Sequence, residues 1–369
     1  MTQEGDMRKT RKQPIRPGPS ADAATGTKEV RDKAALGLSA SSLVWRDRTQ
    51  YSQVRLDELK RRLADLKELR DFPNLTVFGA GSYARLEASE YSDIDMFFMM
   101  DTSRDQIAEY RTRSLRLWGK LIEIIQVMRF PSFSNDCEYL RILHTPDIVE
   151  KLGSRLDDHE NFFTARMLLL LESKCLYGET VFDTTIQHII RSYFKDFPDH
   201  KETFQPMFLM NDICRFWKTL LLNYENKRSV RLLADENQRT KQKVRNFKLK
   251  YSRMTTCFAT AAALGSHRAP VTEEQVFALT RLTPRERLQS VVERIPEVAP
   301  HVDQVLERYA EFLEMTGLPT TSLEAKFSDK QKRTEMFARA KEYGDAMFRL
   351  ISAIDAADNR LRLLRTLVI

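Results

Sequence analysis

Residues 75–100 of the chain read LTVFGAGSYARLEASEYSDIDMFFMM. Short apolar runs at both ends of this stretch, 75–78 and 96–100, predict two buried strands. The first run leads into a turn that contains two glycines, and Asp93 and Asp95 come immediately before the second run. Because side chains alternate along a strand, these two carboxylates are expected to point to the same face. The stretch therefore predicts a strand–turn–strand unit with an acidic pair at the start of its second strand.

These residue types suit phosphate chemistry. Two neighbouring carboxylates repel each other unless a cation lies between them, and hard divalent cations such as Mg²⁺ take oxygen ligands while also holding substrate phosphates. The turn at Gly81 and Ser82 can offer backbone N–H groups and a hydroxyl to a phosphate oxygen. The pattern therefore indicates phosphoryl or nucleotidyl transfer. The alternative interpretation is a hairpin with an exposed Ser-Asp-x-Asp turn that binds nothing.

The arrangement resembles the signature of the DNA polymerase beta nucleotidyltransferase superfamily. The shared features are a strand, the Gly-Ser pair 81–82, an intervening segment, and the Asp-Ile-Asp sequence 93–95 that opens an apolar strand. The resemblance is strong over residues 70–100 and weaker as far as about residue 255. The segment 170–178, LLESKCLYG, is loosely similar to a leucine-rich helix of PII-uridylyltransferase-like proteins.

The resemblance implies a template-independent nucleotidyltransferase that depends on Mg²⁺ or Mn²⁺. In such an enzyme Asp93, Asp95 and a third carboxylate hold two metal ions, one carrying the triphosphate and one activating the acceptor hydroxyl. The third carboxylate is usually on the next strand, where Glu138 is the first candidate and Asp136 the second. A glutamate departs from the usual aspartate, and a solvent-facing carboxylate at the start of a strand is the alternative interpretation of Glu138.

The remaining pattern predicts an α/β (α+β) nucleotidyltransferase core with a small mixed sheet, followed by a mainly α-helical C-terminal region. Apolar spacing predicts helices at 48–70 and 104–127, and a run that is apolar nearly all round predicts a buried helix at 162–176. Residues 138–143 read as a strand. We expect four segments: a disordered basic tail (1–45), a nucleotidyltransferase catalytic domain (46–150), a helical nucleotide- or substrate-binding lobe (151–265) and a C-terminal helical domain without apparent chemistry (266–369).

Two helical stretches within residues 205–255 carry cations among apolar residues. The cations are Arg215, Lys218, Lys248, Lys250 and Arg253. We expect Lys248 and Arg253 to bind the triphosphate together with Gly81 and Ser82, so that 205–255 forms the far wall of a nucleotide cleft. The alternative is an amphipathic helix pair whose cations have internal carboxylate partners.

Composition bounds the class of protein. The 369 residues are 42% hydrophobic and 30% charged, and the formal net charge of +7 permits binding of nucleotides or nucleic acid. No apolar run approaches the length of a transmembrane helix, and the N-terminus lacks the apolar core of a secretory signal. The four cysteines form no CxxC pair, so we expect free thiols, a cytoplasmic protein and no membrane partner.

The sequence leaves the acceptor open. With an NTP as donor, we expect the acceptor to be a protein side chain or RNA, as in regulatory uridylyltransferases and toxin-type transferases. One alternative is a second nucleotide, which would give a signalling oligonucleotide as in bacterial phage-defence synthases. Another is a catalytically silent nucleotide-binding module, although the intact acidic pair argues against it.

Overall fold

The computed structural model describes residues 39–102, 107–131, 133, 140–230, 235–357 and 363–368. Residues Val44–Ile369 form one compact unit, and Met1–Leu43 are assigned to a second unit. Most of the expected basic tail, residues 1–38, therefore lies outside the described part. Among the described helices, none is both long and apolar enough to span a bilayer.

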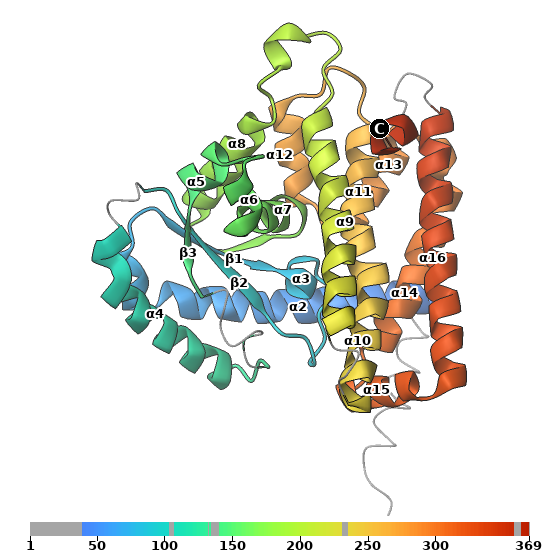
Figure 1. Cartoon of the computed structure of the whole chain (residues 1–369), viewed down its shortest axis with the longest axis horizontal. Coiled ribbons are helices and arrows are strands. Elements are labelled where there is room, and N and C mark those ends of the chain that lie inside the picture. The colour runs from blue at the N-terminus through green and yellow to red at the C-terminus, as the bar shows by residue number, and fades with distance from the viewer. Residues whose placement is uncertain are drawn as a thin grey trace, which may run out of the picture. The chain divides into compact units, whose positions relative to one another are not determined.

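A mixed four-stranded sheet contains the strands in the order β3-β2-β1-β4 (Figure 1). β1 pairs antiparallel with β2 and with β4, and β2 pairs parallel with β3. The first two strands lie where their apolar runs predict them, so the α+β class with a small mixed sheet is confirmed. The strands are β1 (Leu75–Ala80), β2 (Asp95–Met100), β3 (Ile142–His144) and β4 (Lys174–Tyr177).

The predicted helix at 162–176 is wrong in its second part. The helix α7 (Phe162–Leu171) ends early, and the chain then forms β4, which pairs with β1. A short apolar run does not distinguish a buried helix from a buried strand, and here pairing with the sheet decides. Gly178 follows β4 with a φ of +72°, and a Cβ at this position would collide with the carbonyl oxygen of Leu75. Only glycine allows this close approach of the two backbones.

Both faces of the sheet are buried. Alternate strand residues enter two hydrophobic clusters, because Phe78 and Phe97 belong to the larger cluster while Val77 and Phe98 belong to the smaller one. Helices on each side complete these clusters. They are α7 and α8 (Glu179–Ser192) for the larger cluster, and α2 (Ala40–Ala64) and α4 (Ile107–Val127) for the smaller one.

The rest of the described chain is almost entirely helical, as predicted. The predicted helix 48–70 corresponds to α2 and the 3₁₀ turn η1 (Lys67–Asp71), and the predicted helix 104–127 corresponds to α4. The other elements are α3 (Gly81–Ala84), α5 (Thr145–Glu150), α6 (Arg155–His159), η4 (Phe197–Asp199), α9 (Met207–Val230), α10 (Glu236–Lys248), η5 (Leu249–Arg253), α11 (Met254–Gly265), α12 (Glu273–Arg281), α13 (Pro284–Arg294), η6 (Pro296–Val298), α14 (Ala299–Thr316), α15 (Thr320–Ser328), α16 (Lys330–Ala357) and α17 (Leu363–Val368).

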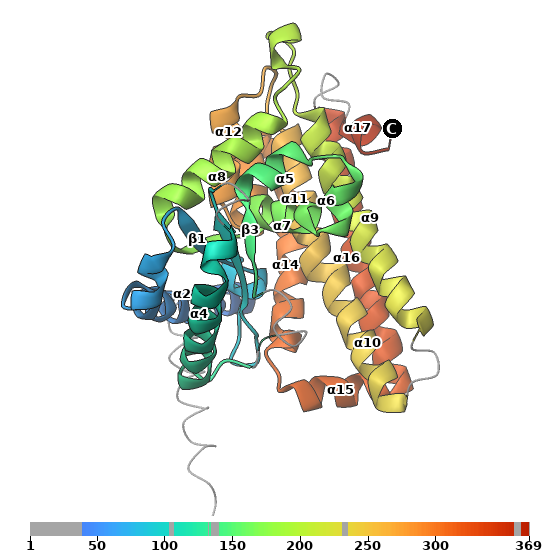
Figure 2. The ribbon, with the colours of Figure 1, turned by 60° about the vertical axis from the view of Figure 1, so that its left-hand side comes forward.

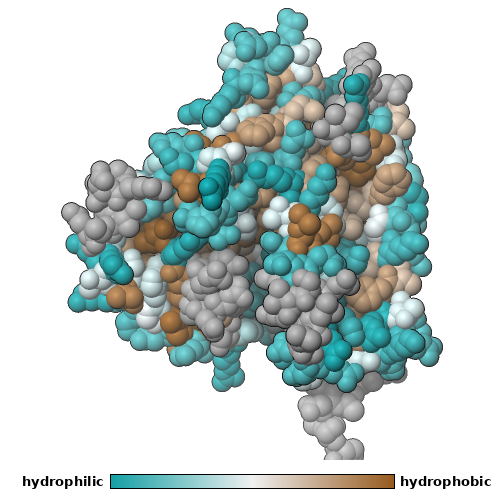
Figure 3. All heavy atoms as spheres, in the orientation of Figure 1, coloured by the Kyte–Doolittle hydropathy of each residue, from teal (hydrophilic) through white to brown (hydrophobic). Residues whose placement is uncertain are grey.

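The larger hydrophobic cluster continues from the sheet into these helices and includes residues from Trp45 to Leu363. It therefore crosses the expected segment boundaries at 150/151 and 265/266, which stay predictions. Figures 1 and 2 show α10 and α11 end to end, with α16 alongside them and α15 next to α10. On the face shown in Figure 3, the coloured hydrophobic residues form separate patches among hydrophilic ones.

Candidate active site

A cavity of about 460 Å³ lies where the connection between β1 and β2 faces α10, α14 and α15. We call it the Asp95 cavity. The predicted site residues that line it are Gly81, Ser82, Asp93, Asp95, Lys248 and Arg253. The fold therefore brings the Gly-Ser turn, the acidic pair and the two preferred cations to one space, and residues 245–253 of segment 205–255 form part of its wall.

The acidic pair lies at the entry to β2. Asp95 is the first residue of the strand and pairs with Ala80, the last residue of β1. Ile94 between the two aspartates is only 2% exposed and packs into the smaller hydrophobic cluster. Asp93 is exposed and Asp95 is half-buried, and both line the cavity. Burial of the intervening isoleucine thus turns both carboxylates to the same side, as the alternation predicts.

Gly81 opens the turn against this pair. Its φ of +72° is in the left-handed region that glycine tolerates, and a Cβ at this position would lie 3.2 Å from Asp95 Oδ2. The missing side chain therefore leaves room beside the carboxylate. Ser82 follows at the cavity wall and is half-buried.

The donor set at Asp93 and Asp95 fits a hard divalent cation. Both residues bring carboxylate oxygens to the cavity, and the glycine leaves space beside one of them. The expected third carboxylate cannot be placed, because Glu138 and Asp136 lie outside the described residues. Within the described ranges, no group of three or more histidine, cysteine or carboxylate side chains is arranged to hold a metal ion.

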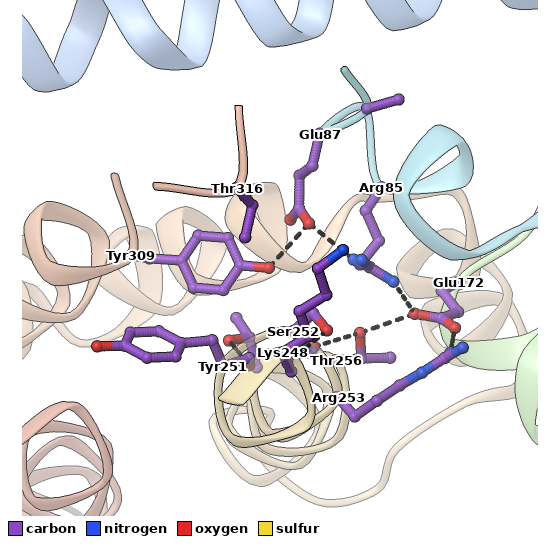
Figure 4. Close-up of polar contacts among 12 residues, drawn as sticks. Arg85, Glu87, Glu172, Lys248, Tyr251, Ser252, Arg253, Thr256, Tyr309 and Thr316 are labelled. Atoms are coloured by element: carbon purple, nitrogen blue, oxygen red, sulfur yellow. Dashed lines mark hydrogen bonds and ion pairs between the residues drawn. The ribbon is translucent and has the colours of Figure 1, made fainter. Parts of the chain in front are cut away.

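A buried ionic network borders the cavity (Figure 4). Arg85 donates from Nε to Glu87 Oε2 at 2.8 Å and from Nη1 to Glu172 Oε2 at 2.6 Å. Tyr309 donates its hydroxyl to the same Glu87 oxygen at 2.8 Å. Burial raises the pKa of Tyr309 well above its usual value, so the hydroxyl stays protonated as this bond requires. The network ties the β1–β2 connection to α14.

Glu172 extends the network to the helix that carries the predicted phosphate ligands. Its side chain is fully buried just after α7 and forms an ion pair with Arg253 of η5. Thr256 of α11 donates to Glu172 Oε2 at 2.9 Å. Because Arg85 and Arg253 share the Glu172 carboxylate, the position of the Arg253 guanidinium depends on Glu172 and on Arg85.

The π turn η5 explains why Lys248 and Arg253 both reach the cavity. α10, η5 and α11 follow one another without a break in the helical backbone. An unbroken α-helix would set residues five apart about 140° from each other, whereas in a π turn such residues face nearly the same side. Desolvation lowers the pKa of Lys248, and the charge of Asp93 acts in the opposite direction. The charges of Lys248 and Asp93 therefore interact across the cavity that both residues line.

The other predicted cations have different environments. Arg215 forms ion pairs with Asp157, Asp158 and Asp212 at 3.6, 3.3 and 3.7 Å, as the amphipathic-helix alternative requires. Neither Arg215 nor Lys218 nor Lys250 lines the Asp95 cavity. These cations therefore belong to the helical surface and not to the candidate site.

Sequence reasoning missed several residues of the site. Arg85 and Glu87 follow the Gly-Ser turn closely, and two opposite charges in the connection between the two predicted strands were an available signal. Glu172 stands out in an apolar segment, but its partners depend on the tertiary fold. The wall formed by α14 and α15 lies in the segment expected to carry no chemistry. Its apolar side chains, with one from η5, are Leu249, Phe312, Leu313, Leu318 and Leu323.

No protein-family model matches this chain, and no curated protein matches its sequence significantly. The interpretation of the Asp95 cavity therefore depends on its geometry and on the chemistry of its residues.

Proposed function

We propose that this protein is a nucleotidyltransferase of the DNA polymerase beta type that moves NMP from an NTP to an acceptor hydroxyl and releases pyrophosphate. The observation that carries this proposal is the lining of the Asp95 cavity, where a Gly-Ser turn, two carboxylates and two cations from a distant helix meet. Small-molecule sites enclose about 300–1,000 Å³, and the cavity falls within that range. A purely structural hairpin has no need of this combination.

The residues divide into two groups by charge. Asp93 and Asp95 would hold Mg²⁺ or Mn²⁺, which when bound neutralises phosphate charge and polarises the reacting oxygens. Lys248 and Arg253 would bind the anionic triphosphate, and Glu172 would keep the Arg253 guanidinium in place. The cations and the acidic pair would thus bind groups of opposite charge in one cavity.

The turn and the acceptor complete the arrangement. Gly81 and Ser82 would contact the terminal phosphates, so that pyrophosphate leaves toward the turn. The oxygen of the acceptor hydroxyl forms a bond to the α-phosphorus, its proton passes to solvent water, and the bond to the pyrophosphate oxygen breaks. This direct displacement needs no protein nucleophile, and no cysteine or histidine is present among the described residues that line the cavity.

The test is transfer of label from each of the four α-³²P-labelled NTPs with Mg²⁺, with and without RNA. Labelled protein, labelled RNA and a free labelled oligonucleotide are three separable products, which assign the acceptor. Asp93→Asn and Asp95→Asn should abolish transfer, while their unfolding midpoints without metal should be no lower than that of the wild type, because one of two repelling charges is removed. Full transfer by either variant, or no transfer by the wild type with any NTP, would overturn the proposal.

A further inference from the structure

The wall of the Asp95 cavity formed by α14 and α15 differs chemically from the wall that carries the acidic pair. Leu313, Leu318 and Leu323 lie on it with Phe312, and Leu249 of η5 adjoins them. The cavity therefore combines charged groups with a mainly apolar surface, which we call its apolar end. A nucleoside triphosphate has the same division, with its phosphates at one end and an aromatic base at the other.

The apolar end is rigid. Phe312 is 4% exposed and stacks on Tyr251 with ring centroids 4.6 Å apart and an interplanar angle of 5°. Tyr251 stacks in turn on Tyr343 at 4.6 Å. Arg48 donates to the carbonyl oxygen of Leu313 and so holds the last turns of α14. A preformed apolar surface binds a flat base without the entropy cost of ordering the protein side chains.

Two threonines line this end, Thr316 and the exposed Thr320. Thr316 ends α14, is half-buried, and donates its hydroxyl proton to the carbonyl oxygens of Phe312 and Leu313 at 3.0 and 3.3 Å. A hydroxyl has one proton and two acceptor lone pairs. Because the helix takes the proton, the Thr316 oxygen is left as an acceptor toward the cavity, and no described group donates to it.

We propose that the apolar end binds the base of the nucleoside triphosphate and that Thr316 accepts a hydrogen bond from an exocyclic amino group of that base. The inference rests on the proposed function and adds the class of nucleotide. Cytosine and adenine carry an amino group where uracil and hypoxanthine carry a carbonyl oxygen. A carbonyl oxygen facing the Thr316 lone pairs has no proton to donate, so CTP and ATP are preferred to UTP and ITP.

The experiment measures binding of non-cleavable α,β-methylene analogues of CTP, UTP, ATP and ITP by calorimetry with Mg²⁺. Within each pair the amino nucleotide should bind about tenfold more tightly, the scale of one hydrogen bond. Thr316→Val keeps the shape of the side chain and should remove this difference. The matched control is Thr334→Val, because Thr334 makes the same bond to the carbonyl four residues earlier, on α16 outside the cavity. Equal affinity within both pairs in the wild type, or an unchanged difference in Thr316→Val, would overturn the inference.

A second variant tests the contact between the base and the apolar end of the cavity. Leu318→Asp should weaken all four analogues by at least about tenfold, since it places a charge against the base. Leu306→Asp, at a half-buried position of α14 that does not line the cavity, is the control. If Leu318→Asp does not fold, Leu318→Ala replaces it, and an unchanged affinity in the folded variant contradicts a base at this end. Transfer activity without base preference would refute this inference alone, whereas base-selective binding without transfer would refute the proposed reaction alone.

Discussion

Gly81 and Asp95 are so close that a side chain at the first would touch the carboxylate of the second. The virtual Cβ of Gly81 lies 3.2 Å from Asp95 Oδ2. The contact joins the turn after β1 to the first residue of β2, and these are the two features of the sequence that most strongly indicate phosphate chemistry. The Gly-Ser turn and the acidic pair are therefore neighbours in space because β1 and β2 pair at this end.

Gly81→Ala should impair the site more than the fold. An alanine at a φ of +72° is strained by about 1 kcal/mol, and its methyl group would press on the Asp95 carboxylate. We expect a loss of unfolding free energy of that size and a much larger relative loss of Mg²⁺-dependent NTP binding. The control is Gly119→Ala in α4, where a Cβ meets nothing within 4 Å, and which should stabilise the protein by about 0.5–1 kcal/mol. Unchanged NTP binding in Gly81→Ala would contradict the proposed role of the turn.

Lys248 and Arg215 should respond differently to loss of charge. Lys248→Gln removes a cation that faces the cavity, so the KM for NTP should rise about ten- to hundredfold with little change in stability. Arg215→Gln breaks ion pairs with three aspartates, so the unfolding free energy should fall by about 1–3 kcal/mol with KM unaltered. Steady-state kinetics and urea unfolding of both variants separate the two roles. The reverse result would place the phosphate-binding cation on α9.

Removal of the charge on Glu172 should weaken both the fold and the site. In Glu172→Gln the buried guanidinium of Arg85 and the half-buried guanidinium of Arg253 lose a shared anion, and loss of a buried ion-pair partner costs about 3–5 kcal/mol. The comparison is Glu123→Gln on the surface of α4, where loss of the pair with Lys120 should cost under about 1 kcal/mol. Urea denaturation measures both changes. Equal effects in the two variants would show that the network contributes no more than a surface ion pair.

Stability should depend on pH through His267. Burial, followed by the charge of Arg294, lowers the pKa of this imidazole to about 4, against about 6.5 in the unfolded chain. The unfolded state therefore binds more protons between these values, so the stability contributed by neutral His267 is present above pH 6.5 and is lost as the pH falls toward 4. His267→Gln should have a shallower decline in unfolding free energy over this window. His200→Gln at an exposed position should keep the wild-type slope, and identical slopes for both variants would rule out His267 as the cause.

The sequence predicts the first two strands and the acidic pair well because both depend on local pattern. Apolar runs mark β1 and β2, and burial of Ile94 alone turns Asp93 and Asp95 the same way. β4 was missed because its apolar residues continue the pattern of α7, and only pairing with a distant strand distinguishes the two. Local pattern therefore predicts the centre of the site but not the full extent of the sheet.

The rest of the site depends on contacts that no local pattern encodes. Glu172 is visible as a charge in an apolar segment, but its partners Arg85 and Arg253 come from segments far away in the chain. The contribution of α14 and α15 to the cavity wall follows from how the C-terminal helices pack. The sequence around Thr316 does not distinguish it from any other threonine at the end of a helix. These residues are found only when the cavity itself is known.

The π turn η5 also changes which side of the helix the residues after it face. One extra residue in a turn advances everything downstream by about 100° around the axis, so α10 and α11 obey two separate periodicities although their backbone is continuous. Deleting a single residue within Leu249–Arg253 would give α10 and α11 one common α-helical periodicity and leave the helix content unchanged. It would also rotate Thr256 around the helix axis and away from Glu172. The chain length of this turn, and not only the identity of its side chains, is thus under constraint.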